Sequence, residues 1–174
     1  MSDEATKPPR VRREQLRHIG LFGGVSDDSL DALSEHLETI PASPGEVVMR
    51  EGEHAREMFV VIAGELEVLR RSRGGAEGRV AVLGPGSWVG EMSILDVQPR
   101  SATVRAVSPC VLVRVRAEDL DALYRRDMKS HLLIILNIAR ELSRRLRVAD
   151  GMIAGFLSAM LDENLGFPRD KVGP

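Results

Sequence analysis

The stretch "GEMSILDVQPRSATVRA", residues 90–106, places a carboxylate and a guanidinium in an otherwise small and apolar segment. The two charged groups belong to Glu91 and Arg100. Each stands near residues that are too small to fill a core, namely Gly90, Ser93, Ser101 and Ala102. Because such neighbours leave space around a charged side chain, the pattern indicates a cavity with two charged walls.

The two charges suit different parts of one ligand. Arg100 offers a planar fork of donors for a phosphate, and it stays charged when buried. An ionised Glu91 can only accept hydrogen bonds, so it suits a hydroxyl. A 3′,5′-cyclic nucleotide, with one phosphate anion and one free ribose hydroxyl, meets both requirements. The alternative reading is a solvated or cross-strand ion pair between the two residues.

The residues beside the two charges can add donors for an anion. Gly90 permits a close backbone approach, and the amides of Met92 and Ser93 can begin one helical turn that faces it. Ser101 offers a hydroxyl, and Ala102 leaves its own amide unobstructed. These positions extend the candidate ligand site beyond the two charges.

The composition is that of an ordinary globular chain. It has 174 residues and a formal net charge of −2, which allows one core with an accessory element and does not favour a polyanion such as DNA as a partner. The single cysteine, Cys110, is expected to be a small core residue and indicates a cytosolic location. We expect no association with membranes.

Catalytic and metal-binding arrangements are not recognisable in the sequence. The histidines are scattered, without a cysteine or acidic partner at metal-ligand spacing, so no metal site is expected. No serine or cysteine has a histidine partner in a known nucleophilic arrangement. We therefore predict that the protein is not an enzyme and uses no cofactor.

Short apolar runs separated by turn residues fill residues 41–115. The runs are rich in Val and Ile, and the polar stretch 70–79 is typical of a hairpin tip, with Gly74 and Gly75 supplying positive φ. Strands this short and closely spaced favour a small antiparallel barrel or jelly roll. We predict a mainly β fold, an antiparallel β-roll (jelly roll, double-stranded β-helix), with flanking helices.

Helical patterns lie on both sides of the β region. A helix over residues 26–38 has Ser26 as its candidate N-cap, and a helix over 117–127 places Leu120, Leu123 and Tyr124 on one side. The expected domains are a disordered arm (1–12), the β-roll with its flanking helices (13–127), a long C-terminal helix (128–163) and a tail (164–174).

The long helix carries an apolar seam with the spacing of a coiled coil. Steps of three and four residues connect Leu132, Ile135, Ala139, Leu142, Leu146, Ala149, Ile153, Phe156 and Met160. A second apolar side, expected to pack on the β core, comprises Leu133, Leu136 and Ile138. Because the seam continues well beyond this second side, the pattern favours a parallel homodimer through residues 132–160. The alternative is a long helix folded back on its own domain.

Residues 90–106 resemble the phosphate-binding cassette of cyclic-nucleotide-binding domains, found in bacterial catabolite activators and in regulatory subunits of the cyclic-AMP-dependent protein kinase. The segments "PGEVVMREGE", "MFVVIAGELEV" and "LGPGSWVGE" resemble the turns of the same β-roll, and "IGLFGGVSDDSLDALSEHL" resembles its leading helices. Together the resemblance spans about residues 15–160. It implies that Glu91 holds the ribose 2′-hydroxyl and that Arg100 and Ser101 hold the cyclic phosphate.

The resemblance implies further contacts to the ligand. Backbone amides of Met92 and Ala102 would assist at the phosphate, and Val80 and Val82 would lie in the strand that flanks the base. Ser101, in place of threonine, favours cyclic AMP. The choice between cyclic AMP and cyclic GMP stays open, because Ala149 and Asp150 stand where the family's long helix meets the base.

The function implied by this resemblance is that of a cytosolic cyclic-nucleotide sensor or regulatory module. It would signal through its C-terminal helix, as a homodimer, to a protein effector in trans. The segment "DENLGFPRDKVGP" after the seam is too short for a helix-turn-helix domain, so direct DNA binding is not expected. Two alternatives remain: a nucleotide-free interaction or dimerisation module of the same fold, and a fragment of a DNA-binding transcription regulator.

Overall fold

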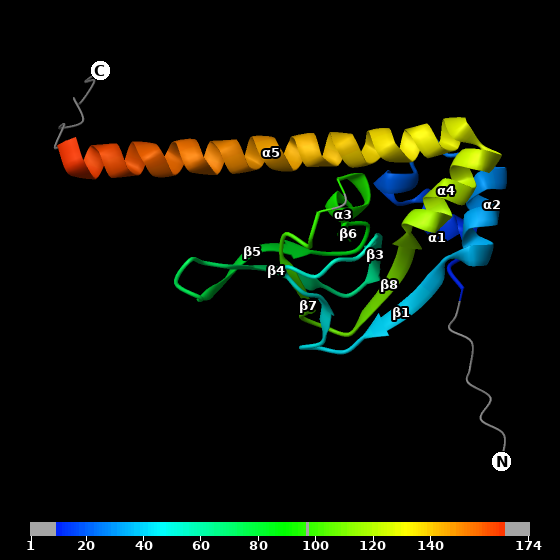
Figure 1. The fold of residues 1–174 in the computed structure, drawn as a ribbon, viewed down its shortest axis with the longest axis horizontal. Coiled ribbons are helices and arrows are strands. Elements are labelled where there is room, and N and C mark those ends of the chain that lie inside the picture. Colours follow the sequence, from blue (N-terminus) through cyan, green and yellow to red (C-terminus); the bar gives the residue numbers. More distant parts are fainter. Residues whose placement is uncertain (1–9, 97, 166–174) are drawn as a thin grey trace, which may run out of the picture. The chain divides into compact units, whose positions relative to one another are not determined.

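The computed structural model describes residues 10–96 and 98–165, and Figure 1 shows its ribbon. Most of the expected arm (1–12) and tail (164–174) lies outside the described residues. The helices are α1 (Arg13–Arg17), the 3-10 turn η1 (Gly20–Phe22), α2 (Asp27–His36), α3 (Met92–Leu95), α4 (Ala117–Arg126) and α5 (Met128–Leu165). The strands are β1 (Glu38–Ala42), β2 (Val47–Met49), β3 (Glu57–Ala63), β4 (Leu66–Arg71), β5 (Glu77–Leu83), β6 (Trp88–Val89), β7 (Thr103–Ala106) and β8 (Cys110–Arg116).

Two four-stranded antiparallel sheets form a β-roll, which confirms the predicted fold class. One sheet has the order β1-β8-β3-β6, and the other has the order β2-β7-β4-β5. β8 lies inside the first sheet, where its Val113 pairs with Val60 of β3. Pro41 lies in β1, an edge strand, where its missing amide hydrogen leaves no central ladder position unpaired.

The two sheets enclose an apolar core. Its buried members are Ala42, Met49, Phe59, Val61, Leu66, Val89, Val104, Ala106, Cys110 and Leu112. Cys110 is a free, buried thiol in this core, as its place in an apolar strand predicted. Gly64 links β3 to β4 at a φ of +84°, and a Cβ there would lie 2.3 Å from the carbonyl oxygen of Pro109. The β3–β4 turn therefore requires glycine.

The two flanking helices form as predicted, but one of the residues expected on the apolar side of α4 is exposed. Ser26 is the N-cap of α2, and its hydroxyl accepts a hydrogen bond from the amide of Ser29. Leu120 and Leu123 of α4 are buried. Tyr124 was predicted on the same side, but it is 50% exposed and contacts the ring of His131 edge-on. A residue next to a buried position lies at the border of the apolar face, where only packing decides its exposure.

The hairpin between β4 and β5 has one glycine with positive φ where two were expected. Gly75 has a φ of 85°, whereas Gly74 is not among the glycines with positive φ. The turn closes through hydrogen bonds between Ser72 and Ala76 and between Gly75 and Ser72. A single residue in the left-handed region is sufficient for this loop.

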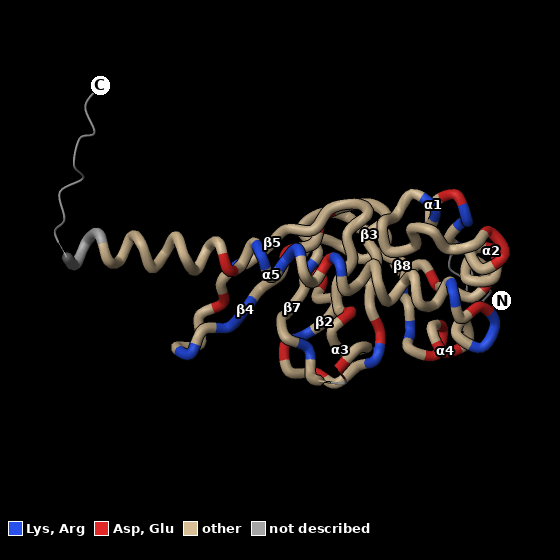
Figure 2. Tube along the Cα trace, turned by 90° about the horizontal axis from the view of Figure 1, so that it is seen from above, with Lys and Arg blue, Asp and Glu red and all other residues tan. Residues whose placement is uncertain are grey.

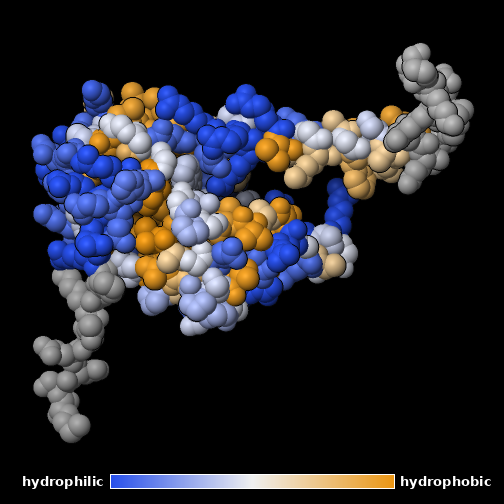
Figure 3. All heavy atoms as spheres, turned by 180° about the vertical axis from the view of Figure 1, so that it is seen from behind, coloured by the Kyte–Doolittle hydropathy of each residue, from blue (hydrophilic) through white to orange (hydrophobic). Residues whose placement is uncertain are grey.

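The chain divides into two compact units, residues 1–137 and 138–174, and α5 runs through the division. In the first unit, Ile134 of α5 is fully buried. In the second unit Ile138 is also buried, but the large apolar residues from Leu146 onward are exposed, and Phe156 reaches 70%. The stretch 151–161 carries no charged residue, as the tan distal part of α5 shows in Figure 2. Figure 3 shows apolar side chains along the same helix. Within the described residues, no helix is long and apolar enough to span a bilayer.

Candidate functional site

The cassette of residues 90–106 folds as a tight turn, one helical turn and a strand. Gly90 follows β6 with a φ of +91°, in the left-handed region that favours glycine. A Cβ at this position would lie 2.5 Å from Nη1 of Arg100 and 3.1 Å from the carbonyl oxygen of Glu57. Glu91 is the N-cap of the short helix α3, which begins at Met92 as the sequence predicted. Gly90 is therefore required by its conformation and by the side chain packed against it.

Arg100 is buried at 4% exposure, with its guanidinium directed into the protein. Its Nη1 donates to the carbonyl oxygens of Glu57 at 2.6 Å and Gly90 at 3.1 Å, and to the hydroxyl of Ser93 at 2.8 Å. Its Nε is buried and makes no hydrogen bond with the described residues. Burial lowers the pKa of Arg100, whereas the nearby carboxylates, led by Glu57, act to raise it.

Glu91 and Ser93 complete the wall around this guanidinium. Glu91 is 2% exposed, and its charge acts on Arg100. Ser93 is also buried, and its hydroxyl donates to the carbonyl oxygen of Gly90 at 2.9 Å while it accepts from Arg100. The structure thus brings Gly90, Glu91, Ser93 and Arg100 together. The small residues Gly90 and Ser93 therefore accept hydrogen bonds from Arg100, and the guanidinium does not face an open cavity as the sequence pattern indicated.

Glu57 belongs to this cluster and was not identified from the sequence. Its carboxylate lies 4.0 Å from Nη2 of Arg100 and 3.8 Å from Nη1 of Arg114. Arg114 also forms an ion pair with Glu38 across the β1–β8 pair. The only signal for Glu57 in the sequence was its place as an acidic residue at the start of an apolar strand. Its contact with Arg100 joins positions 43 residues apart, which no local pattern reveals.

The other predicted cassette residues lie at the rim of this cluster. The hydroxyl of Ser101, which is exposed, contacts the sulfur of Met92 at 3.8 Å. Ala102 is buried just before β7. The backbone of Arg100 is anchored on both sides, since its amide donates to the carbonyl oxygen of Glu53 at 2.8 Å and its carbonyl oxygen accepts from the amide of Gly52 at 2.9 Å. The rim therefore offers a hydroxyl and backbone groups beside a buried cation.

Val80 and Val82, predicted to flank the base, lie on β5 in the second sheet. They are 58% and 49% exposed, so apolar surface is available there. Val82 pairs with Glu67 of β4, and the register shifts by one residue around Val80. The role of both valines in ligand binding stays a prediction.

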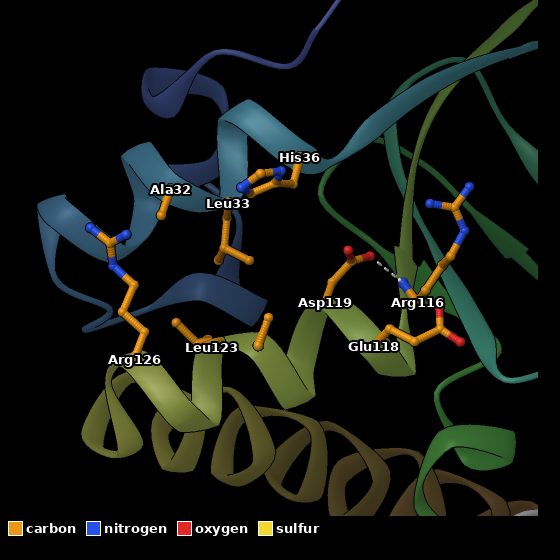
Figure 4. Close-up of a pocket in the computed structure, with 9 residues that line it drawn as sticks. Ala32, Leu33, His36, Arg116, Glu118, Asp119, Leu123 and Arg126 are labelled. Atoms are coloured by element: carbon orange, nitrogen blue, oxygen red, sulfur yellow. Dashed lines mark hydrogen bonds between the residues drawn. The ribbon is translucent and has the colours of Figure 1, made fainter.

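A separate cavity of about 480 Å³ lies between α2 and α4 (Figure 4). Leu33 and Leu123 contribute its apolar part, with His36 and Arg126 among the polar residues around it. The amide of Arg116 donates to the carboxylate of Asp119 at 2.7 Å at one end. None of the predicted ligand-binding residues lines this cavity. In the described part of the chain, no group of three or more potential metal ligands is assembled.

Comparison with known families agrees with the geometry of the cassette. The family described as "Cyclic nucleotide-binding domain" matches residues 40–127, which include the whole cassette and both sheets except the first residues of β1. This chain belongs to the cyclic nucleotide-binding domain family. The resemblance inferred from residues 90–106 is thereby confirmed at the level of the family.

Individual relatives are similar over most of this chain. A CRP-like cAMP-activated global transcriptional regulator of Mycobacterium tuberculosis is 31% identical over 144 residues, covering 83% of this chain and 62% of the relative. The crystal structure of the Thermus thermophilus catabolite activator protein has a TM-score of 0.69 at 34% identity, covering 80% of this chain and 63% of that one.

Relatives of other activities share a smaller part of the chain. The acetyltransferase Pat of Mycolicibacterium smegmatis is 33% identical over 103 residues, which cover 58% of this chain and 30% of the relative. The chain thus spans 62% of the tuberculosis regulator's length and less of the acetyltransferase. The family resemblance concerns the nucleotide-binding domain that these proteins share.

Proposed function

We propose that the protein is a cyclic-nucleotide sensor that binds cyclic AMP in the cassette of residues 90–106 and works by binding, without catalysis. The observation that supports this proposal is the burial of both Glu91 and Arg100 in one loop built on Gly90. A buried cation with donors left over suits a phosphate, and a buried carboxylate suits a ribose hydroxyl. Ser101 at the rim and the exposed Val80 and Val82 are the further proposed contacts. A cytoplasmic location, supported by the single free cysteine, is part of the same proposal.

The output of this sensor is proposed to pass through α5 as a parallel homodimer, and from there to a protein effector. From Leu146 onward the large seam residues are exposed, as an unpaired coiled-coil face would be. In the heptads of the seam, Arg145 directly precedes the core residue Leu146. Asp150 directly follows the next core residue, Ala149. In a parallel pair, Arg145 of one copy therefore lies beside Asp150 of the second copy, so the flanking charges are complementary.

A second candidate is a module of the same fold that binds no nucleotide and acts through α5 alone. One observation favours it, because Nη1 of Arg100 already donates to three acceptors within the protein. A phosphate would have to compete with these acceptors or use Nη2 and Nε. The two candidates make opposite predictions for nucleotide binding.

Calorimetric titration of the purified chain with cyclic AMP, and separately with cyclic GMP, tests the proposal. Saturable binding with one nucleotide per chain supports the sensor, and the tighter ligand identifies the base preference. Fluorescence of the buried Trp88, which lies two residues before Gly90, gives a second readout. If neither nucleotide binds, the nucleotide-free module replaces the sensor.

The variant Arg100→Ala identifies the binding residue. Loss of a charged partner to the phosphate is expected to cost about 3 kcal/mol, roughly a hundredfold in Kd. Ser101→Ala is the milder variant because Ser101 is exposed, and it is expected to weaken binding about tenfold without affecting the fold. Arg125→Ala on the exposed face of α4 is the matched control. Circular dichroism verifies folding, and unchanged affinity in both cassette variants would contradict the assignment.

A further inference from the structure

One carboxylate, that of Asp127, joins the start of α2 to the start of α5. Its Oδ2 accepts hydrogen bonds from the hydroxyls of Ser26 at 3.0 Å, Ser29 at 2.8 Å and Ser130 at 2.6 Å. Its Oδ1 accepts from the backbone amide of Ser130 at 3.1 Å, so that Asp127 also caps α5. The four residues lie in two segments, 26–29 at the start of α2 and 127–130 at the start of α5, that are about a hundred positions apart in sequence. This is more than a helix cap needs.

Two of the three serines in this cluster are buried. Ser29 and Ser130 are 1% and 2% exposed, so their hydroxyls depend on protein acceptors. The hydroxyl of Ser130 additionally accepts from the backbone amide of Ser26 at 3.2 Å. Hydrogen bonds from Ser130 first, and then from Ser29, hold the pKa of Asp127 far below its ordinary value. The shared acceptor is therefore charged at neutral pH.

A second polar contact holds α5 further along the helix. The side-chain amide of Asn137 donates to the carbonyl oxygens of Leu21 at 3.1 Å and Gly23 at 3.0 Å. Between the two contacts, Leu133 lies against Gly24, where an added Cβ would be 3.5 Å from its Cδ1. The first turns of α5 thus run along the segment from η1 to α2, with polar bonds at both ends.

We propose that Asp127 latches the start of α5 to the start of α2, so that both segments loosen together when the latch opens. We call this group the serine latch; it comprises Ser26, Ser29, Asp127 and Ser130. Because a hydrogen bond within the protein can be exchanged for one with water, the latch can open without loss of the apolar packing beside it. The inference is independent of nucleotide binding and supplies the proposed sensor with a defined joint.

Amide hydrogen exchange on the full chain tests the latch. Asp127→Asn keeps the shape of the side chain but removes its charge. Amide exchange is expected to become at least tenfold faster at Ser29 and Leu30 of α2 and, in the same variant, over residues 130–133 of α5. Strands β3 and β8 are expected to keep their rates. Asp121→Asn, on the exposed face of α4, is the matched control and should change neither segment.

Ser29→Ala tests the same coupling from the opposite side and serves if Asp127→Asn does not fold. It removes one donor from α2, and the latch predicts faster exchange over residues 130–133 of α5, far away in sequence. If Ser29→Ala changes only α2, or if Asp127→Asn changes only α5, Asp127 is an ordinary helix cap and the latch is wrong. Unchanged amide exchange in both variants would likewise contradict the latch.

Discussion

The cassette and the distal part of α5 differ in which side chains they bury and which they expose. In the cassette, a carboxylate and a guanidinium are buried among small residues. In the distal part of α5, large apolar side chains such as Ile153 and Phe156 stand in solvent on a stretch without charged residues. Each region therefore departs from the usual distribution of polar and apolar groups, and it does so in the opposite direction.

The difference indicates what each region is built to contact. A buried charge is costly unless it is hydrogen-bonded, and the fold meets this cost for Arg100 with three acceptors. An exposed apolar face has no such internal compensation and marks an interaction surface. The polar groups of the cassette are thus satisfied within the fold, and the proposed ligand would have to replace some of their partners, whereas the apolar face of the distal helix is the surface that the proposed dimer would cover.

The largest expected effect concerns the exposed apolar face. Leu146→Glu places a charge at a core position of the proposed dimer and is expected to weaken dimerisation by at least about 3 kcal/mol, roughly a hundredfold in Kd. Sedimentation equilibrium at increasing protein concentration measures this effect. The control is Val148→Glu, because Val148 is similarly exposed, at 55% against 62%, but lies off the seam. Equal effects of both variants would remove the seam as the interface.

The next effect concerns the crowded cassette. Gly90→Ala introduces a Cβ at positive φ and against Arg100 and Glu57, with an expected loss of about 1–3 kcal/mol in the free energy of unfolding. Gly86→Ala is the matched control, because Gly86 has a φ of 83° and nothing within 4 Å of the added Cβ. Urea denaturation measures both variants. If the two lose the same free energy, the contact between Gly90 and Arg100 contributes nothing beyond the backbone conformation.

The smallest effect concerns the serine latch between α2 and the start of α5. Because the folded state lowers the pKa of Asp127, its contribution to stability is complete above the ordinary carboxyl pKa of about 4 and declines as the pH falls below it. The difference in unfolding free energy between the natural chain and Asp127→Asn should therefore be largest near neutral pH and shrink in acid. A difference that stays constant with pH would show that the charge of Asp127 does not stabilise the fold.

Much of the fold could be predicted because its signals are local. The alternation of short apolar runs and turns predicted the β-roll, and Ser26 before an amphipathic segment predicted the start of α2. The cassette could be recognised because its residues lie within one short segment. In each case, neighbouring residues in the sequence are also neighbours in space.

The residues that were missed act across long distances in sequence. Glu57 of β3 reaches Arg100 in the loop before β7, and Asp127 accepts hydrogen bonds from hydroxyls of α2. Tyr124 was expected on the same side as Leu120 and Leu123, yet it is 50% exposed. Nothing in the local pattern of these residues distinguishes a surface position from a joint between distant elements.

By itself, the sequence determined the β-roll, the cassette and the seam, because periodicity, turn residues and the small neighbours of Glu91 and Arg100 depend on positions close in the chain. Only the tertiary structure decided that Arg100 points inward to Glu57, Gly90 and Ser93. It alone revealed that Asp127 holds α2 and α5 together. The physical reason is that hydrogen bonds of buried polar groups are satisfied by whichever acceptors packing brings near, and packing joins elements that the sequence keeps apart.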